Sequence, residues 1–146
     1  MAFHIIEIVR TDFKTARPAD ELNSRMQRLL KMPHRYGPAR LAIGRSLAIA
    51  PQPKLSTSFT GYGKAIKGEN LFGIGEDLAT WVTLIVEHAG NPDLDRADFQ
   101  SLVAAHWSRG IYALWEDWRA TAGDFDFFMA KLADRAGGRR LARASR

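Results

Sequence analysis

Apolar residues recur at helical spacing along most of this chain, and proline and glycine separate the segments. The longest segment runs from Asp95 to about Thr121, and one side of the predicted helix is apolar throughout. That side consists of Phe99, Leu102, Val103, Trp107, Ile111, Leu114, Trp115 and Trp118. Such spacing is typical of amphipathic helices on a core. With 146 residues and no cysteine, the chain predicts one mainly α domain without disulfides, thiolate metal sites or a cysteine nucleophile.

The same pattern predicts four further helices. They cover residues 18–32, 38–49, 77–88 and 124–135. Prolines mark the start of the first two, where a missing N–H costs nothing. The segment 77–88 is apolar almost all round, so we expect it to be the central helix of the core. Between the second and third of these helices, residues 66–73 are predicted to form a turn that joins two short extended pieces.

The N-terminal segment Phe3–Val9 is rich in Ile, Val and Phe, and this predicts a short strand covered on both faces. With the next two helices it gives a strand-helix-helix order over residues 1–50, as in ribbon-helix-helix proteins. Those proteins pair strands between chains and insert the ribbon into the major groove. Here the ribbon would present Glu7 and apolar groups, which complement DNA poorly. A ribbon-helix-helix transcriptional regulator is therefore an alternative rather than the first interpretation.

Charge is distributed unevenly along the chain. The 47 residues from Leu22 to Gly68 contain no Asp or Glu, and we call this run the carboxylate-free block. Its nine cations are Arg25, Arg28, Lys31, Arg35, Arg40, Arg45, Lys54, Lys64 and Lys67. Residues 69–136 carry a net −7, and residues 137–146 carry four arginines on what we expect to be a flexible tail beyond a single domain, 1–136. Clustered cations favour a polyanion partner. The alternative is that they form a solvated face, which faces the acidic half (76–136) of the same chain or of a neighbouring subunit.

Catalytic motifs are hard to find in the sequence. The four histidines, His4, His34, His88 and His106, lack metal-binding spacing, and His106 is interpreted as a hydrogen-bonded core residue. The glycines match neither a phosphate loop nor a dinucleotide fingerprint. Asp124 and Asp126 are interpreted as carboxylates that cap the start of a helix or interact with its dipole. We therefore predict no metal, no cofactor and no enzymatic activity, with a nickase kept as an alternative.

One loop combines aromatic and cationic residues. Phe59 and Tyr62 stand among Lys54, Lys64 and Lys67. Aromatic side chains between cations can stack on bases. They can equally anchor the loop by packing, which we favour.

Three segments carry a family resemblance. They are residues 39–47 (ARLAIGRSL), 66–73 (IKGENLFG) and 106–111 (HWSRGI), and their order and spacing resemble the DndE family of DNA phosphorothioation proteins over about residues 3–119. The resemblance implies a small helical fold with a ribbon-helix-helix-like element and a homotetramer. It also implies binding to DNA, with a preference for nicked duplex, through basic surface residues. DndC-like and DndD-like partners would supply sulfur-transfer and ATPase chemistry, since a chain without cysteine cannot carry a persulfide.

The sequence thus predicts a cytoplasmic, non-catalytic DNA-binding subunit with no membrane segment. The residues expected to contact phosphate are Arg25, Arg28, Lys31, Arg35, Arg40 and Arg45, with Lys64 and Lys67 as second candidates. Arginine suits this role because its planar fork donates two hydrogen bonds to one phosphate. A scaffold that binds acidic partner proteins is a further alternative.

Overall fold

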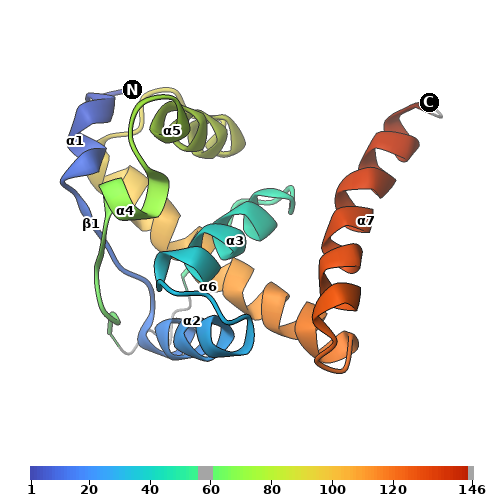
Figure 1. Ribbon diagram of the computed structural model, residues 1–146. Helices are drawn as coiled ribbons and strands as arrows, with labels where there is room; N and C mark the ends of the chain where they lie inside the picture. Colours follow the sequence, from blue (N-terminus) through green and yellow to red (C-terminus); the bar gives the residue numbers. More distant parts are fainter. Residues whose placement is uncertain (56–60, 145–146) are drawn as a thin grey trace.

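The computed structural model describes the backbone of residues 1–55 and 61–144 and the side chains as far as residue 134. In chain order the elements are α1 (Ile5–Val9), β1 (Asp12–Phe13), α2 (Arg17–Leu29), α3 (Tyr36–Leu47), β2 (Ile66–Lys67), α4 (Gly68–Phe72), α5 (Gly75–Ala89), α6 (Arg96–Ala120) and α7 (Phe125–Ala144). Helices dominate, which confirms the mainly α class (Figure 1). In this part of the chain no helix combines the length and the hydropathy needed to cross a bilayer.

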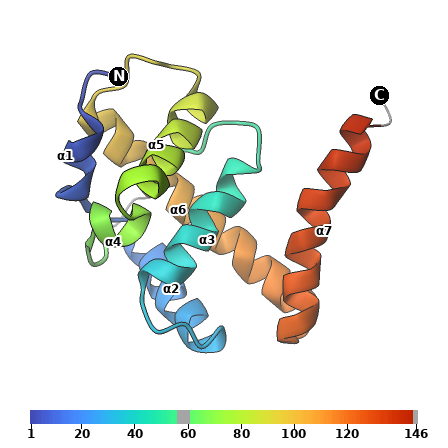
Figure 2. The same cartoon turned by 45° about the horizontal axis from the view of Figure 1, so that its top comes forward.

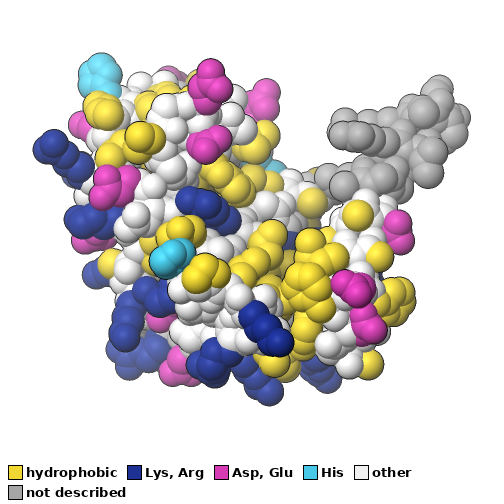
Figure 3. All heavy atoms as spheres, in the orientation of Figure 1, with side chains coloured by type: hydrophobic (Ala, Val, Ile, Leu, Met, Phe, Trp, Pro, Cys, Tyr) yellow, Lys and Arg dark blue, Asp and Glu magenta, His cyan; other side chains and the backbone are white. Residues whose placement is uncertain are grey.

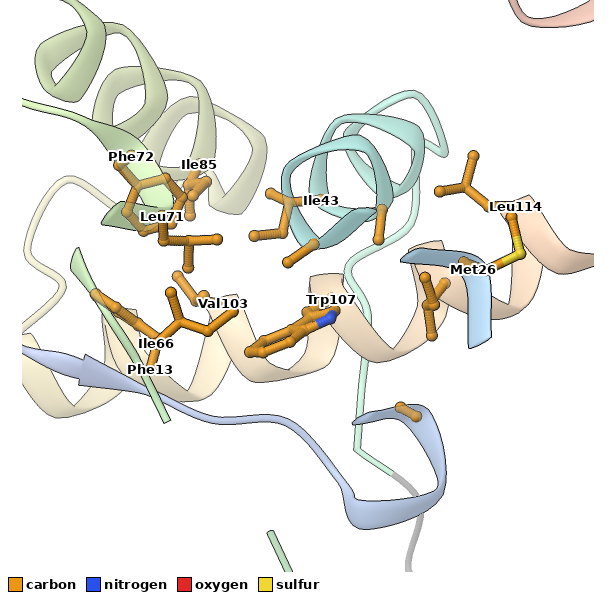
Figure 4. Packing of buried hydrophobic residues seen from close by; sticks show 14 of the residues in the cluster. Phe13, Met26, Ile43, Ile66, Leu71, Phe72, Ile85, Val103, Trp107 and Leu114 are labelled. Atoms are coloured by element: carbon orange, nitrogen blue, oxygen red, sulfur yellow. The ribbon is translucent and has the colours of Figure 1, made fainter. Parts of the chain in front are cut away.

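The long helix α6 is the centre of the fold. It begins at Asp95, whose side chain accepts a hydrogen bond from the Asp98 N–H (2.7 Å). α3 packs along it at very short range, because a Cβ on Gly110 would lie 1.6 Å from the Ala42 carbonyl oxygen. α2 lies beside the same helix, and its Asn23 Oδ1 accepts a hydrogen bond from Trp107 Nε1 (3.1 Å). The buried side chains therefore converge on α6 (Figure 4).

The prediction that residues 77–88 form the central helix is wrong. This segment is helical, as α5, but only one face of it is buried, through Leu78, Val82 and Ile85. Leu84, on another face, is 45% exposed. An apolar composition cannot show which face of a helix meets a neighbour, and here α6 takes the central position instead.

The predicted strand at Phe3–Val9 is also wrong, because residues 5–9 form helix α1. The side chain of Glu7 accepts a hydrogen bond from the His4 N–H (3.0 Å), which satisfies a donor at the helix start. Ile8 is fully buried, whereas Ile6 is 71% exposed. A strand-helix-helix order does occur, but its strand is β1, which pairs antiparallel with β2 of the same chain.

Residues 66–73 form strand β2 and the short helix α4 rather than a turn between extended pieces. A Cβ on Gly68 would lie 1.7 Å from the Ile8 carbonyl oxygen, so glycine lets α4 approach the end of α1. Phe72 at the end of α4 meets Phe13 of β1 edge-on, with ring centroids 5.3 Å apart. This segment thereby ties the N-terminus to the core.

The last helix, α7, leads away from the body of the molecule (Figures 1 and 2). Its buried anchor is Phe128, whose ring meets Trp118 of α6 at 5.4 Å between centroids. The Asp124 Oδ1 accepts a hydrogen bond from the Phe127 N–H (2.8 Å), so the capping role predicted for Asp124 is confirmed. The helical backbone continues through Gly137 and Gly138 to Ala144 instead of ending before them.

Candidate nucleic-acid interface

The exposed face of α2 carries a group of cations. Its buried face carries Ala19, Asn23 and Met26. Arg25 and Arg28 project from the opposite side and are exposed, as is Lys31 directly after the helix. Lys and Arg gather along the lower part of the molecule, where α2 lies (Figure 3). These three cations were predicted as phosphate contacts, and the structure places them together.

A tryptophan supports one of these cations. The Arg25 guanidinium lies over the ring of Trp115 from α6, 4.4 Å from its centroid. A cation over an aromatic face is attracted by the ring and keeps its N–H groups in the plane for other partners. Arg25 is therefore oriented while its side chain remains exposed.

The segment that follows residue 60 brings a further cation to the start of α2. The Gly63 N–H donates to the Thr15 carbonyl oxygen (2.9 Å), and the Lys64 N–H donates to Asp20 Oδ2 (3.1 Å). The Lys64 side chain is exposed beside them. Lys67, on β2, is exposed as well, and its Nζ lies 3.5 Å from an Asp12 carboxylate oxygen in an open ion pair.

Arg35, by contrast, is engaged within the fold. Its guanidinium forms an ion pair with Asp20 and donates to the carbonyl oxygens of Lys64 (3.2 Å) and Ala65 (3.4 Å). It therefore joins the start of α3 to α2 and to the 61–65 segment.

Arg40 and Arg45 are engaged in the same way. Arg40 donates to the carbonyl oxygens of Leu71 (2.6 Å) and Asn70 (2.7 Å), where a cation satisfies the last acceptors of α4. Arg45 pairs with the buried carboxylate of Asp117 on α6, at 2.9 Å from Nε to Oδ2. Of the eight predicted cations, Arg35, Arg40 and Arg45 are thus only partly exposed and hydrogen-bonded within the fold, and Arg25, Arg28, Lys31, Lys64 and Lys67 are exposed, Lys67 in its open pair with Asp12.

The sequence prediction did not include Arg17, which is exposed in the first turn of α2. At helical spacing it lies on the face that carries Arg25 and Arg28, and so does Glu21. Arg17 precedes the carboxylate-free block, so a charge count along the chain excluded it. The periodicity of α2 would have found it.

A buried polar cluster lies between α3, α5 and α6. The Ser46 Oγ lies 2.8 Å from His106 Nδ1 and accepts a hydrogen bond from Arg109 Nε (2.8 Å). His88 packs against His106 with ring centroids 4.9 Å apart. Burial, and then the nearby His88 and Arg109, lower the pKa of His106 to about 3. Ser46 and His106 are both fully buried, so this pair is closed to substrate, and the core role predicted for His106 is confirmed.

Arg109 completes the cluster by closing the end of α3. Its guanidinium donates to the carbonyl oxygens of Ser46 (2.9 Å), Ile49 (3.3 Å) and Pro51 (2.6 Å). Burial lowers the pKa of Arg109. This arginine therefore stabilises the turn after α3.

No three His, Asp or Glu side chains approach one another closely enough to hold a metal in the described part of the chain.

Of the two aromatic residues in the predicted cationic loop, Tyr62 is 45% exposed, and its backbone forms a bridge with Ala16. Phe59 falls outside the described residues. The side chains of the arginines after residue 134 fall outside them too.

Comparison of the chain with protein-family models, with curated proteins and with solved structures found no match. The relation to the DndE family accordingly stays a resemblance carried by the three segments quoted above.

Proposed function

We propose that this protein is a non-catalytic DNA-binding subunit that holds duplex DNA, and nicked duplex in particular, against α2. The observation that carries the proposal is the exposed group of Arg25 and Arg28 on α2 and Lys31 directly after it, within a block that has no carboxylate of its own. Such a group attracts a polyanion and releases the counterions condensed on it. Lys64 adds a fourth cation next to the start of the same helix.

The proposal has a quantitative consequence in salt. Each phosphate neutralised contributes a slope of about −0.9 to a plot of log K against log[salt]. Arg25, Arg28, Lys31 and Lys64 together therefore predict a slope of roughly −3 to −4. Electrophoretic binding to intact, nicked and single-stranded DNA of one sequence, repeated across a salt series, measures both this slope and the preference for a nick. A flat salt response would contradict the proposal.

A triple substitution locates the surface. We expect Arg25→Ala, Arg28→Ala and Lys31→Ala together to reduce the salt slope by about 3 and to weaken binding on all DNA sequences alike. The matched control replaces three exposed cations from other elements, Arg10, Arg96 and Arg119. Equal losses in the two triple variants would mean that net charge, and not α2, determines binding.

The narrower role, in DNA phosphorothioation, is carried by the resemblance to the DndE family. It predicts a homotetramer and complexes with DndC-like and DndD-like proteins. Co-purification with such partners after nuclease treatment, together with mass measurement of the free protein, tests this part separately. If partners bind and naked DNA does not, the scaffold alternative replaces DNA binding.

The ribbon-helix-helix alternative depended on a free strand at Phe3–Val9. Residues 5–9 are helical, and β1 has its partner β2 within the chain. Competition between a palindromic site and random duplex tests this alternative. Relaxation of supercoiled plasmid in Mg²⁺ or Mn²⁺ tests the nickase alternative.

A further inference from the structure

The corner between α2 and α3 carries an aromatic stack. The rings of His34 and Tyr36 are stacked, with centroids 4.9 Å apart and planes inclined by 16°. The Arg40 guanidinium lies over the Tyr36 ring, 4.5 Å from its centroid. His34 is exposed, while Tyr36 is partly buried. A flat exposed ring with an aromatic neighbour is a surface on which a further flat ring can stack.

The stack is held in place by the fold. Arg40 is fixed by its two hydrogen bonds to the end of α4. The Gly37 N–H donates to the His34 carbonyl oxygen (3.1 Å), and Asn23 Nδ2 donates to the Arg35 carbonyl oxygen (3.1 Å). The backbone on both sides of the rings is therefore anchored to α2 and α3. The protein side of this surface is therefore already ordered before a ligand stacks on it, which lowers the entropic cost of binding.

Cations surround the stack. Lys31 is exposed three residues before His34, and Lys64 is held close to Arg35, which donates to its carbonyl oxygen. Among the carboxylates of α2 and α4, Asp20 is paired with Arg35, whereas Glu21 and Glu69 are exposed. This arrangement complements a nucleotide in a DNA strand: the ring can stack on the base, and the cations can bind the phosphates on either side of it.

We propose that His34 and Tyr36 form a stacking platform for one unpaired nucleobase, whose flanking phosphates contact Lys31 and Lys64. This inference rests on the proposed function and deepens it, because phosphate contacts alone do not distinguish paired from unpaired DNA. A base inside a continuous duplex has both faces covered by its neighbours. The platform therefore adds affinity only where a base is free to leave the stack.

The experiment compares a blunt duplex with the same duplex carrying a short single-stranded overhang. The wild-type protein binds the overhang more tightly, and His34→Ala removes about 5- to 150-fold of affinity for it, the range expected for one stacked base. The affinity for the blunt duplex is unchanged in this variant. His34→Phe retains the advantage, because a phenyl ring stacks as an imidazole does. His4→Ala, which removes another exposed histidine, at the start of α1, leaves both affinities unchanged.

Photochemical crosslinking gives a second readout. A 5-iododeoxyuridine in the overhang should crosslink to the peptide that contains His34 and Tyr36, and the same base placed inside the blunt duplex should not. If the wild type binds blunt duplex with the predicted salt slope but shows no overhang advantage, or if the crosslink maps elsewhere, the platform is refuted and the α2 surface stands. If the wild type binds neither DNA, the proposed function fails as well.

Discussion

At the scale of single residues, neighbouring cations differ according to what each side chain meets. Arg25 and Arg28 lie on the open face of α2, whereas Arg35 meets a carboxylate and two carbonyl oxygens. Glycine shows the same dependence on context. Gly110 and Gly44 both lie inside helices, yet a Cβ would meet backbone at the first and only the ring of Trp81, at 3.7 Å, at the second.

The two glycines give a matched stability test. We expect Gly110→Ala to lower the free energy of unfolding by about 3 kcal/mol or more, because α3 must move away from α6 to admit a methyl group. Gly44→Ala should leave it unchanged or raise it by about 0.5–1 kcal/mol, since alanine is the better helix former. Urea denaturation followed by circular dichroism measures both. Similar losses in the two variants would show that the close contact at Ala42 does not control the helix spacing.

At the scale of elements, charged side chains hold α3 in place from several sides. Arg40 joins it to α4, Arg109 closes its end, and Arg45 reaches Asp117 on α6. The contact of Arg45 with Asp117 is an ion pair, and only 15% and 3% of the two side chains are exposed. A charge in such a position is costly when its partner is removed.

We expect Arg45→Met to lower the free energy of unfolding by about 3 kcal/mol, because the ion pair with Arg45 is lost while the Asp117 carboxylate stays buried. The double variant Arg45→Met, Asp117→Leu should recover much of this loss, as apolar groups of similar size replace the pair. Denaturation of the two single variants and the double variant completes the cycle. Purely additive effects would argue against direct coupling. DNA affinity measured on the folded single variant should equal that of the wild type, in contrast to the triple α2 variant.

At the scale of the whole molecule, the net charge of +5 is the sum of a basic segment, residues 22–68, an acidic segment, residues 69–136, and the two ends of the chain. The exposed cations of α2 face solvent, and Arg45 of the carboxylate-free block pairs with Asp117 of the acidic half. The buried cluster around His106 makes the stability of the whole fold depend on pH, because protonation of the His106 imidazole opposes folding. His88 and Arg109 face this imidazole and disfavour its cation further.

We expect the free energy of unfolding to fall as the pH is lowered from about 6.5 towards 3. In this window the unfolded chain protonates His106, whose pKa in the fold is lowered to about 3, and so takes up more protons than the native state. The contribution of one such group is about 1.4 kcal/mol per pH unit. Chemical denaturation between pH 6 and 4 should therefore show a slope steeper by this amount in the wild type than in His106→Gln. Parallel slopes would refute a depressed pKa at this site.

The sequence by itself determined the helical class, most helix positions and the basic character of residues 22–68. These properties depend on periodicity, proline placement and composition, which are local. It also indicated the core position of His106 and the capping role of Asp124, because helix faces and helix starts follow from spacing.

Only the tertiary structure decided which cations remain exposed, which helix is central and which short segment forms a strand. Arg35, Arg40 and Arg45 acquire partners up to 72 residues away along the chain, and sequence spacing does not encode such distances. Residues 5–9 became helical, despite their strand-forming composition, as Glu7 satisfied the helix start and Ile8 entered the core. The physical reason is the same in each case. The local sequence pattern determines which residues share a face of a helix or strand, and tertiary packing determines which residues that face contacts.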